Sequence, residues 1–240
     1  MYNDHVSEQG KEGKEMEFTV QGRKISIYGE AEADAPVVYL NTVHGEGKAV
    51  WEQCQHIGCP AFSLVAISGI QWDHDMSPWP IPPISKGDTP CTGGADAYLT
   101  LLTEEILPAV EETLGGKPRY SALAGYSLGG LFAVYASYHT DAFARIISAS
   151  GSFWFPWFID YVKEHAMQRI PEKMYFSLGD REAFTKNPYL SSVEERTKML
   201  YEYYRHQGIP TTFVLNPGNH FRNADRRMAD GILWSLDDKI

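Results

Sequence analysis

Short apolar runs alternate with helix-forming stretches along most of this 240-residue chain. Runs such as 37–40, 61–67 and 120–125 fit buried strands, and stretches with helical periodicity lie between or after them. Alternation of this kind favours a mainly parallel sheet with helices on both faces and right-handed crossovers. Because such sheets bind ligands beyond the carboxyl ends of their strands, functional residues are expected in the loops that follow strands.

The pattern predicts about eight strands and six helices. The first two strands flank a short connection, Gln21-Gly22-Arg23, which is typical of an antiparallel hairpin at the edge of a sheet. The predicted strands are 17–20, 24–28, 37–40, 61–67, 120–125, 145–150, 173–178 and 211–215. The predicted helices are 49–56, 96–114, 128–138, one within 157–167, 192–206, and a last one after residue 222.

Two segments depart from this alternation. Residues 1–15 hold few apolar side chains that could anchor them to a core, so a flexible leader is expected there. Residues 16–240 are expected to form one catalytic domain, since this length buries a single sizeable core. Within that domain, residues 68–94 are rich in Pro, Gly, Trp and Asp and are predicted to form a long ordered loop over the site.

Charge and composition exclude several functional classes. The net charge of -10, from 21 basic and 31 acidic residues, would repel a nucleic-acid backbone. No run is apolar enough for a membrane span, and the first residues lack the apolar stretch of a signal peptide, so a cytoplasmic protein is expected. The cysteines Cys54, Cys59 and Cys91 suggest neither a disulfide framework nor a metal site, and no cofactor is expected. The oligomeric state is left open.

The hexapeptide 125–130, Gly-Tyr-Ser-Leu-Gly-Gly, joins a predicted strand to a predicted helix. It matches the G-x-S-x-G pattern of a nucleophile elbow, a strained turn that exposes a serine at the top of the sheet. Gly125 and Gly129 would let neighbouring backbone pass closely. The helix amino terminus behind Ser127 favours a developing anion, so the motif predicts Ser127 as a nucleophile and the Leu128 N–H as an oxyanion donor. By position, the second donor is the backbone N–H of Val43 or of Thr42, in the loop after the predicted strand 37–40.

A serine hydroxyl needs a general base, and a histidine is the usual one. His220 lies in the loop after the last predicted strand, 93 residues after the serine, which is the chain order that this type of fold requires. The acid that orients it is expected after the preceding strand, where Asp180 and Glu182 both stand. From the residues alone, either carboxylate fits this role.

Four side chains are candidates for contact with a substrate. His44 lies in the loop of the second oxyanion donor, Tyr126 lies in the elbow, and Trp72 and Trp79 lie in the long loop, where they suit an apolar wall. His74 competes with His44 for such a contact, and each equally fits an ordinary polar loop histidine.

Segments 125–130, 77–80, 179–182 and 216–221 together resemble the putative esterase family of the α/β-hydrolase superfamily, over roughly residues 16–238. That family is related to esterase D, to feruloyl esterases and to enterobactin-type siderophore esterases. The resemblance implies the α/β-hydrolase fold, and it selects Glu182 over Asp180 as the acid. Siderophore esterases of this kind commonly carry basic residues for their anionic ligand, whereas the long loop here is acidic.

Taken together, these features predict a serine-dependent carboxylesterase-type hydrolase that acts on a small-molecule ester through an acyl-enzyme intermediate. An acyltransferase that uses the same three residues is one alternative. A non-catalytic binding protein that retains the fold is another, although such proteins usually lack the serine or the histidine. The acid and alcohol parts of the substrate are not indicated.

Overall fold

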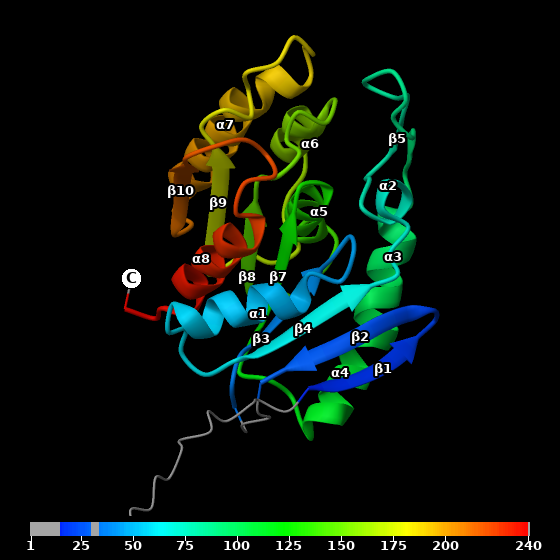
Figure 1. Cartoon of the computed structure of the whole chain (residues 1–240), viewed down its shortest axis with the longest axis vertical. Helices are drawn as coiled ribbons and strands as arrows, with labels where there is room; N and C mark the ends of the chain where they lie inside the picture. Colours follow the sequence, from blue (N-terminus) through cyan, green and yellow to red (C-terminus); the bar gives the residue numbers. More distant parts are fainter. Residues whose placement is uncertain (1–14, 30–33, 240) are drawn as a thin grey trace, which may run out of the picture.

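An eight-stranded sheet forms the centre of the computed structural model, which describes residues 15–29 and 34–239 (Figure 1). The predicted leader lies outside these residues except for Glu15. The strands follow the order β1-β2-β4-β3-β7-β8-β9-β10. They are β1 Met16–Val20, β2 Arg23–Tyr28, β3 Val37–Asn41, β4 Ser63–Ser68, β7 Ser121–Tyr126, β8 Arg145–Ala149, β9 Lys173–Gly179 and β10 Thr211–Asn216.

Only the first two strands break the parallel arrangement of this sheet. β1 pairs antiparallel with β2, and β2 pairs antiparallel with β4, while the pairs from β4 to β10 are parallel. The hairpin turn consists of Gln21 and Gly22, both with positive φ (45° and 77°), as expected where two residues join twisted strands. Arg23 belongs to β2 rather than to the predicted connection. The predicted mainly parallel sheet is confirmed.

Helices cover both faces of the sheet. They are α1 Gly47–His56, α2 Trp72–Asp75, α3 Ala95–Leu101, α4 Leu107–Leu114, α5 Leu128–Ala136, α6 Phe158–Glu164, α7 Val193–His206 and α8 Ala224–Leu236. α1 and α8 lie side by side over one face (Figure 1). Side chains alternate along β3, so that Val38 and Leu40 pack in the core beneath α1 and α8, while Tyr39 packs in the core on the opposite face. This burial on both faces explains why the central strands are continuous apolar runs.

The long helix predicted over 96–114 is interrupted. A π-helical turn, Leu102–Ile106, separates α3 from α4. Pro108 follows directly in the first turn of α4. Proline has no N–H and clashes with the carbonyl four residues earlier in a regular α-helix, and the wider π turn accommodates this defect. The helical period predicts the apolar face correctly but does not reveal the change in winding.

The long loop predicted over 68–94 has its own local structure. It contains the short helix α2 and a two-stranded ribbon formed by β5 Pro80–Ile81 and β6 Cys91–Thr92. Asp75 is buried and accepts hydrogen bonds from the Arg23 guanidinium at 2.7 Å and from the Gln71 N–H at 2.9 Å, which fastens the loop to β2. Asp75 is therefore a structural residue of this loop.

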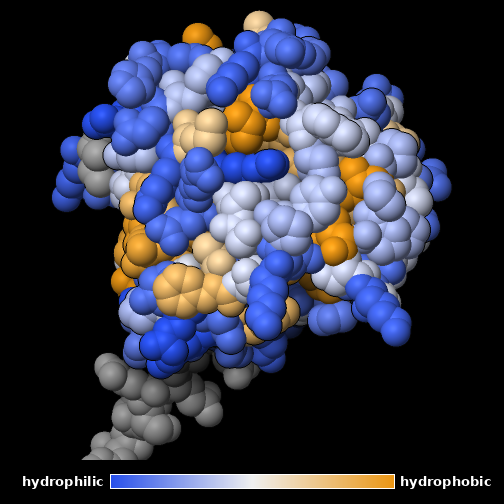
Figure 2. Space-filling model, turned by 90° about the horizontal axis from the view of Figure 1, so that it is seen from above, coloured by the Kyte–Doolittle hydropathy of each residue, from blue (hydrophilic) through white to orange (hydrophobic). Residues whose placement is uncertain are grey.

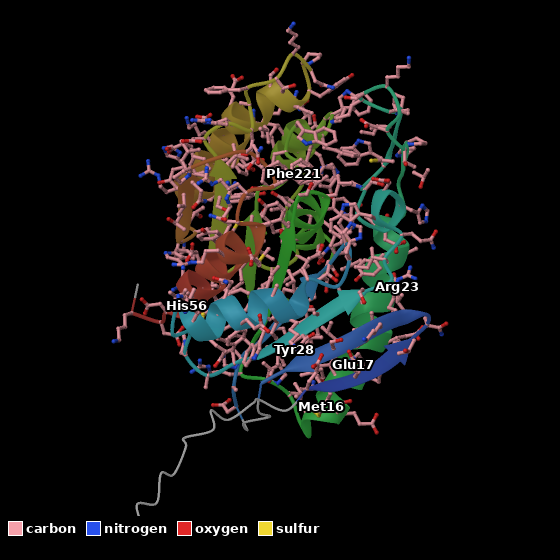
Figure 3. The ribbon with its side chains drawn as sticks, viewed as in Figure 1. Met16, Glu17, Arg23, Tyr28, His56 and Phe221 are labelled. Carbon is pink, nitrogen blue, oxygen red and sulfur yellow. The ribbon has the colours of Figure 1, made fainter. Side chains whose placement is uncertain are left out.

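The parallel strands bring their carboxyl ends, and the loops that follow them, to one edge of the sheet. Figure 3 places Phe221 in this upper part of the molecule, away from Met16 and Glu17 on the hairpin. Seen from above, this end shows a mainly hydrophilic surface with separate hydrophobic patches (Figure 2). No helix of the described residues is both long enough and apolar enough to cross a membrane.

Candidate active site

Ser127 occupies a strained turn between β7 and α5. Its backbone has φ 57° and ψ −123°, a conformation that L-residues rarely adopt. A Cβ added to Gly125 would lie 2.1 Å from the carbonyl oxygen of Gly129, and one added to Gly130 would lie 2.6 Å from Ser148 Oγ. Glycine at these positions is therefore required for β7, α5 and β8 to approach each other. This is the strand-turn-helix geometry of a nucleophile elbow.

The Ser127 hydroxyl points toward a second serine. Its Oγ lies 3.3 Å from Ser152 Oγ, and the Ser152 N–H donates to the Ser127 carbonyl oxygen at 3.0 Å. The distance between the two hydroxyls is long for an O–H···O hydrogen bond, so this contact is weak. In the described part of the chain no hydrogen bond joins Ser127 to His220, although both residues line the same two cavities. Such bonds often form only when a substrate is bound.

His220 is held by Glu182. Its Nδ1 lies 2.7 Å from Glu182 Oε2, while its side chain remains 30% exposed and the carboxylate is only 4% exposed. A carboxylate at Nδ1 places the proton there and leaves Nε2 as the basic nitrogen. The Tyr126 hydroxyl donates to the His220 carbonyl oxygen at 2.8 Å, which fixes the backbone of the same residue.

Four donors surround the Glu182 carboxylate. Besides His220, its Oε1 accepts from the Gly179 N–H at 2.6 Å, from Ser150 Oγ at 2.7 Å and from Arg227 Nη1 at 3.1 Å. Burial raises the pKa of Glu182, but the hydrogen bond and charge of His220 and the bonds from Ser150 and Gly179 outweigh it, so the pKa lies below its ordinary value. This carboxylate is held in its ionised form.

Asp180, the alternative acid, has a different partner. Its Oδ1 accepts the Gly218 N–H at 2.8 Å, and its own N–H donates to the Asn216 carbonyl oxygen at 2.8 Å. These bonds tie the loop after β9 to the loop after β10, which carries His220. The structure thus brings Glu182, and not Asp180, to the histidine.

The two predicted oxyanion donors come from two different segments of the chain. The Leu128 N–H is at the first turn of α5, and Val43 lies in the loop between β3 and α1. The Thr42 N–H, the alternative to Val43, donates to the Ile67 carbonyl oxygen at 2.9 Å and is thus engaged in the sheet. Within the described ranges, no backbone acceptor is bound to the N–H of Leu128 or Val43.

Two cavities meet at Ser127. The first has a volume of about 620 Å³ and extends under the 68–94 loop; the second has a volume of about 650 Å³ and extends between the Val43 loop and the start of α8. We call them the loop-side and helix-side cavities. Ser127, Trp72, His220 and Phe221 line both. A ligand bound at Ser127 therefore has a space on either side of it.

Three of the four predicted substrate-binding residues line these cavities. Trp72 lines both, and His44 and Tyr126 line the helix-side cavity. Trp79 lines neither, because its indole packs among Phe155, Phe158 and Tyr161 and its Nε1 donates to the Pro156 carbonyl oxygen at 3.2 Å. Instead of the expected wall contact, Trp79 packs the 68–94 loop against the segment 155–161.

His74, the competitor of His44, also lies outside both cavities. Its Nδ1 is 2.6 Å from Thr92 Oγ1, a bond within the 68–94 loop. His74 is thus an ordinary polar loop histidine.

Three residues of the site escape sequence reasoning: Ser150, Ser152 and Arg227. The two serines directly follow β8 at the functional edge of the sheet, and this position is a signal that the sequence contains. Arg227 shares the buried face of α8 with Met228, Gly231 and Ile232 at helical spacing. An arginine on an apolar helix face indicates a buried anionic partner, because an unpaired charge there is costly.

A family model described as Putative esterase matches residues 24–222. The uncharacterized protein YbbA of Bacillus subtilis is 24% identical over 153 residues, which cover 62% of this chain and 61% of that protein. The chain thus spans about three fifths of the length of this curated relative.

Solved structures share the fold over nearly the whole chain. The siderophore hydrolase EstA from Aspergillus nidulans has a TM-score of 0.72 at 18% identity, with 98% of each chain covered. An IroE-like serine hydrolase from Shewanella oneidensis has a TM-score of 0.71 at 21% identity, with 93% of this chain and 79% of that chain covered. The chain has the α/β-hydrolase fold predicted from its sequence and belongs to the putative esterase family.

Proposed function

We propose that this protein is a carboxylic ester hydrolase in which Ser127, His220 and Glu182 act as a catalytic triad. The observation that carries the proposal is the 2.7 Å bond from His220 to the buried Glu182 carboxylate, at cavities that also expose the strained Ser127. Membership of an esterase family supports the same activity. A cytoplasmic location remains a prediction.

In the first half-reaction, Ser127 Oγ attacks the ester carbonyl carbon while its proton passes to His220 Nε2. The oxyanion that forms is stabilised by the N–H groups of Leu128 and Val43. When the carbon–oxygen bond to the alcohol breaks, His220 returns its proton to the leaving alkoxide, and an acyl-enzyme on Ser127 remains. The ionised Glu182 stabilises the imidazolium in each transition state.

In the second half-reaction, water attacks the acyl-enzyme and His220 removes its proton. The same two N–H groups stabilise the second oxyanion. Collapse of this intermediate releases the carboxylic acid and returns the proton to Ser127 Oγ. Each half-reaction thus ends with His220 neutral and ready for the next proton transfer.

Replacement of the nucleophile tests the proposal. Ser127→Ala should lower kcat for a short-chain p-nitrophenyl ester by more than about 10⁴-fold, because the triad acts as a unit. Ser191→Ala, an exposed serine that lines neither cavity, is the matched control and should keep wild-type activity.

A fluorophosphonate probe gives a second measurement that does not depend on the choice of ester. It should label the wild-type protein and the Ser191→Ala control on Ser127, as located by peptide mass spectrometry. Turnover that persists in Ser127→Ala, or a probe adduct on another residue, would show that the nucleophile lies elsewhere.

A further inference from the structure

Apart from histidines, the ionisable side chains that set the charge of the two cavities are acidic. Asp73 and Asp88 line the loop-side cavity, and Glu46 and Asp225 line the helix-side cavity. No lysine or arginine lines either cavity in the described part of the chain, although Lys86 lies between two lining residues of the loop. The space around Ser127 therefore has a negative potential, which a concave site focuses.

These four carboxylates differ from Glu182, the other acidic residue of the site. Glu182 is compensated by its contact with Arg227 Nη1 at 3.1 Å. Among the described residues, Asp73, Asp88, Glu46 and Asp225 form no ion pair. Their charge is thus available to a ligand.

Asp73 and Asp88 lie close enough to affect each other. Burial, and then the charge of Asp88, raise the pKa of Asp73. Burial raises the pKa of Cys91, a buried residue of the same cavity, to about 11, and both carboxylates add to this effect. Asp73 is half-buried and Asp88 is exposed. Two carboxylates that repel each other are both stabilised by a cation placed between them.

Aromatic rings provide the rest of a site for a cation. Trp72 and Trp154 line the loop-side cavity, and Phe221, which is 84% exposed, lines it too. The faces of such rings attract ammonium groups, most strongly where water is excluded. A quaternary or substituted ammonium group thus matches both the charge and the surface of this cavity.

We propose that the loop-side cavity selects esters that carry a positive charge, with Asp73 and Asp88 as the specificity-determining residues. This inference rests on the proposed hydrolase activity. It names a substrate class that differs from the anionic ligands of siderophore esterases. The cationic group lies against the carboxylates of the 68–94 loop while the ester carbonyl lies at Ser127.

Pairs of esters that differ in charge but not in shape test the proposal. For the alcohol part, the pair is acetylthiocholine and S-(3,3-dimethylbutyl) thioacetate. For the acyl part, the pair is p-nitrophenyl 4-(trimethylammonio)butanoate and p-nitrophenyl 5,5-dimethylhexanoate. Each kcat/KM is divided by the rate of hydroxide-catalysed hydrolysis, which removes differences in intrinsic reactivity.

In at least one pair, the cationic ester should be preferred by about tenfold or more at low salt, as two nearby charges and aromatic faces predict. The preference should fall as salt is added, because part of the site is exposed to solvent. The double variant Asp73→Asn/Asp88→Asn should reduce it to within about threefold of unity. Asp141→Asn, an exposed carboxylate beyond the far end of α5, makes the same chemical change and should leave the ratio as in the wild type.

The outcomes separate the two proposals. The charge selection would be overturned if the ratio of normalised kcat/KM values were near one in both pairs, or if the preference survived in the double variant. In either case, Ser127-dependent turnover of the uncharged esters would still support the hydrolase activity. Absence of Ser127-dependent turnover of all four esters would overturn both. A preference lost in the double variant and kept in Asp141→Asn supports the assignment of Asp73 and Asp88.

Discussion

Arg227 is a full charge in the interior of the molecule, and its contacts explain why it is there. Its side chain is 2% exposed and donates to Glu182, to Ser150 Oγ and to the Tyr126 hydroxyl, with a further bond to the Asn219 carbonyl oxygen at 3.1 Å. It thus fixes both the carboxylate and the loop that carries the histidine. The desolvation of a buried ion pair is offset only when further hydrogen bonds form around it, as they do here at Nη1 and Nη2.

Replacement of Arg227 should be far more harmful than replacement of its neighbour. Arg227→Met is expected to lower the free energy of unfolding by about 3–5 kcal/mol, because it leaves the Glu182 charge buried with a missing partner. Arg226→Met, which removes an exposed pair with Asp230, should cost no more than about 1 kcal/mol. Urea unfolding of both variants measures this difference, and equal midpoints would contradict the structural role of Arg227.

At the scale of single residues, local motifs carried the prediction of Ser127 and His220, because each follows a strand at the functional edge. The choice between Glu182 and Asp180 depends on the path of the loop 180–189. Apolar periodicity does not specify this path, and only the family resemblance selected Glu182. The position of Trp79 was missed for a similar reason: the aromatic cluster with Phe155 and Phe158 forms between segments about 80 residues apart. Contacts of that range follow from tertiary packing.

At the scale of elements, the turn from β7 to α5 requires residues without side chains at Gly125 and Gly130. Ser150, like Ser127, has a positive φ, of 47°, and its Oγ reaches Glu182 from this position. Strained backbone of this kind persists only where the surrounding structure enforces it. The close approach of Gly125 to Gly129 is part of that enforcement.

A methyl group on Gly125 should therefore abolish the site. Gly125→Ala places a Cβ 2.1 Å from Gly129 oxygen, so the turn has to open, with loss of both activity and thermal stability. Gly116→Ala, where nothing lies within 4 Å of the added Cβ, should be neutral or slightly stabilising. Ester turnover and thermal melts of the two variants check this, and an active, stable Gly125→Ala protein would refute the steric argument.

The elements themselves were largely predictable, since their apolar periodicity is strong. Their irregular parts were not. The π turn before Pro108 and the ribbon β5–β6 involve five or fewer residues, too few for any periodicity to register. The anchoring of the 68–94 loop by Arg23 on β2 joins residues 52 apart, and only the folded sheet brings them together.

At the scale of the whole molecule, stability should fall at both ends of the pH range. Glu182 and Asp238 have lowered pKa values, that of Asp238 chiefly because of its hydrogen bond with Arg145. Their contributions to the free energy of unfolding are therefore complete above the ordinary carboxyl pKa range and are lost as the pH falls through their pKa values in the folded protein. Burial raises the pKa of Tyr98 and Tyr135, so their contributions are complete below about pH 10 and are lost above it.

The free energy of unfolding should thus be nearly level between about pH 5 and 9 and decline on either side. Urea titrations across the pH range measure it. Between about pH 5 and 3, the free energy of unfolding of the Glu182→Gln variant should fall less than that of the wild type, because the variant has no carboxyl group to protonate at this position. If the free energy of unfolding declined equally in the two proteins, protonation of Glu182 would not be a cause of the acid sensitivity.

The four donors around Glu182 come from the end of β9, from the turn after β8, from the loop after β10 and from α8. α8 in turn rests on α1, near the other end of the chain. No fragment that ends before residue 227 contains the complete set. Recovery of ester turnover during refolding would accordingly measure the docking of α8. A collapsed folding intermediate in which α8 is not yet docked would be inactive.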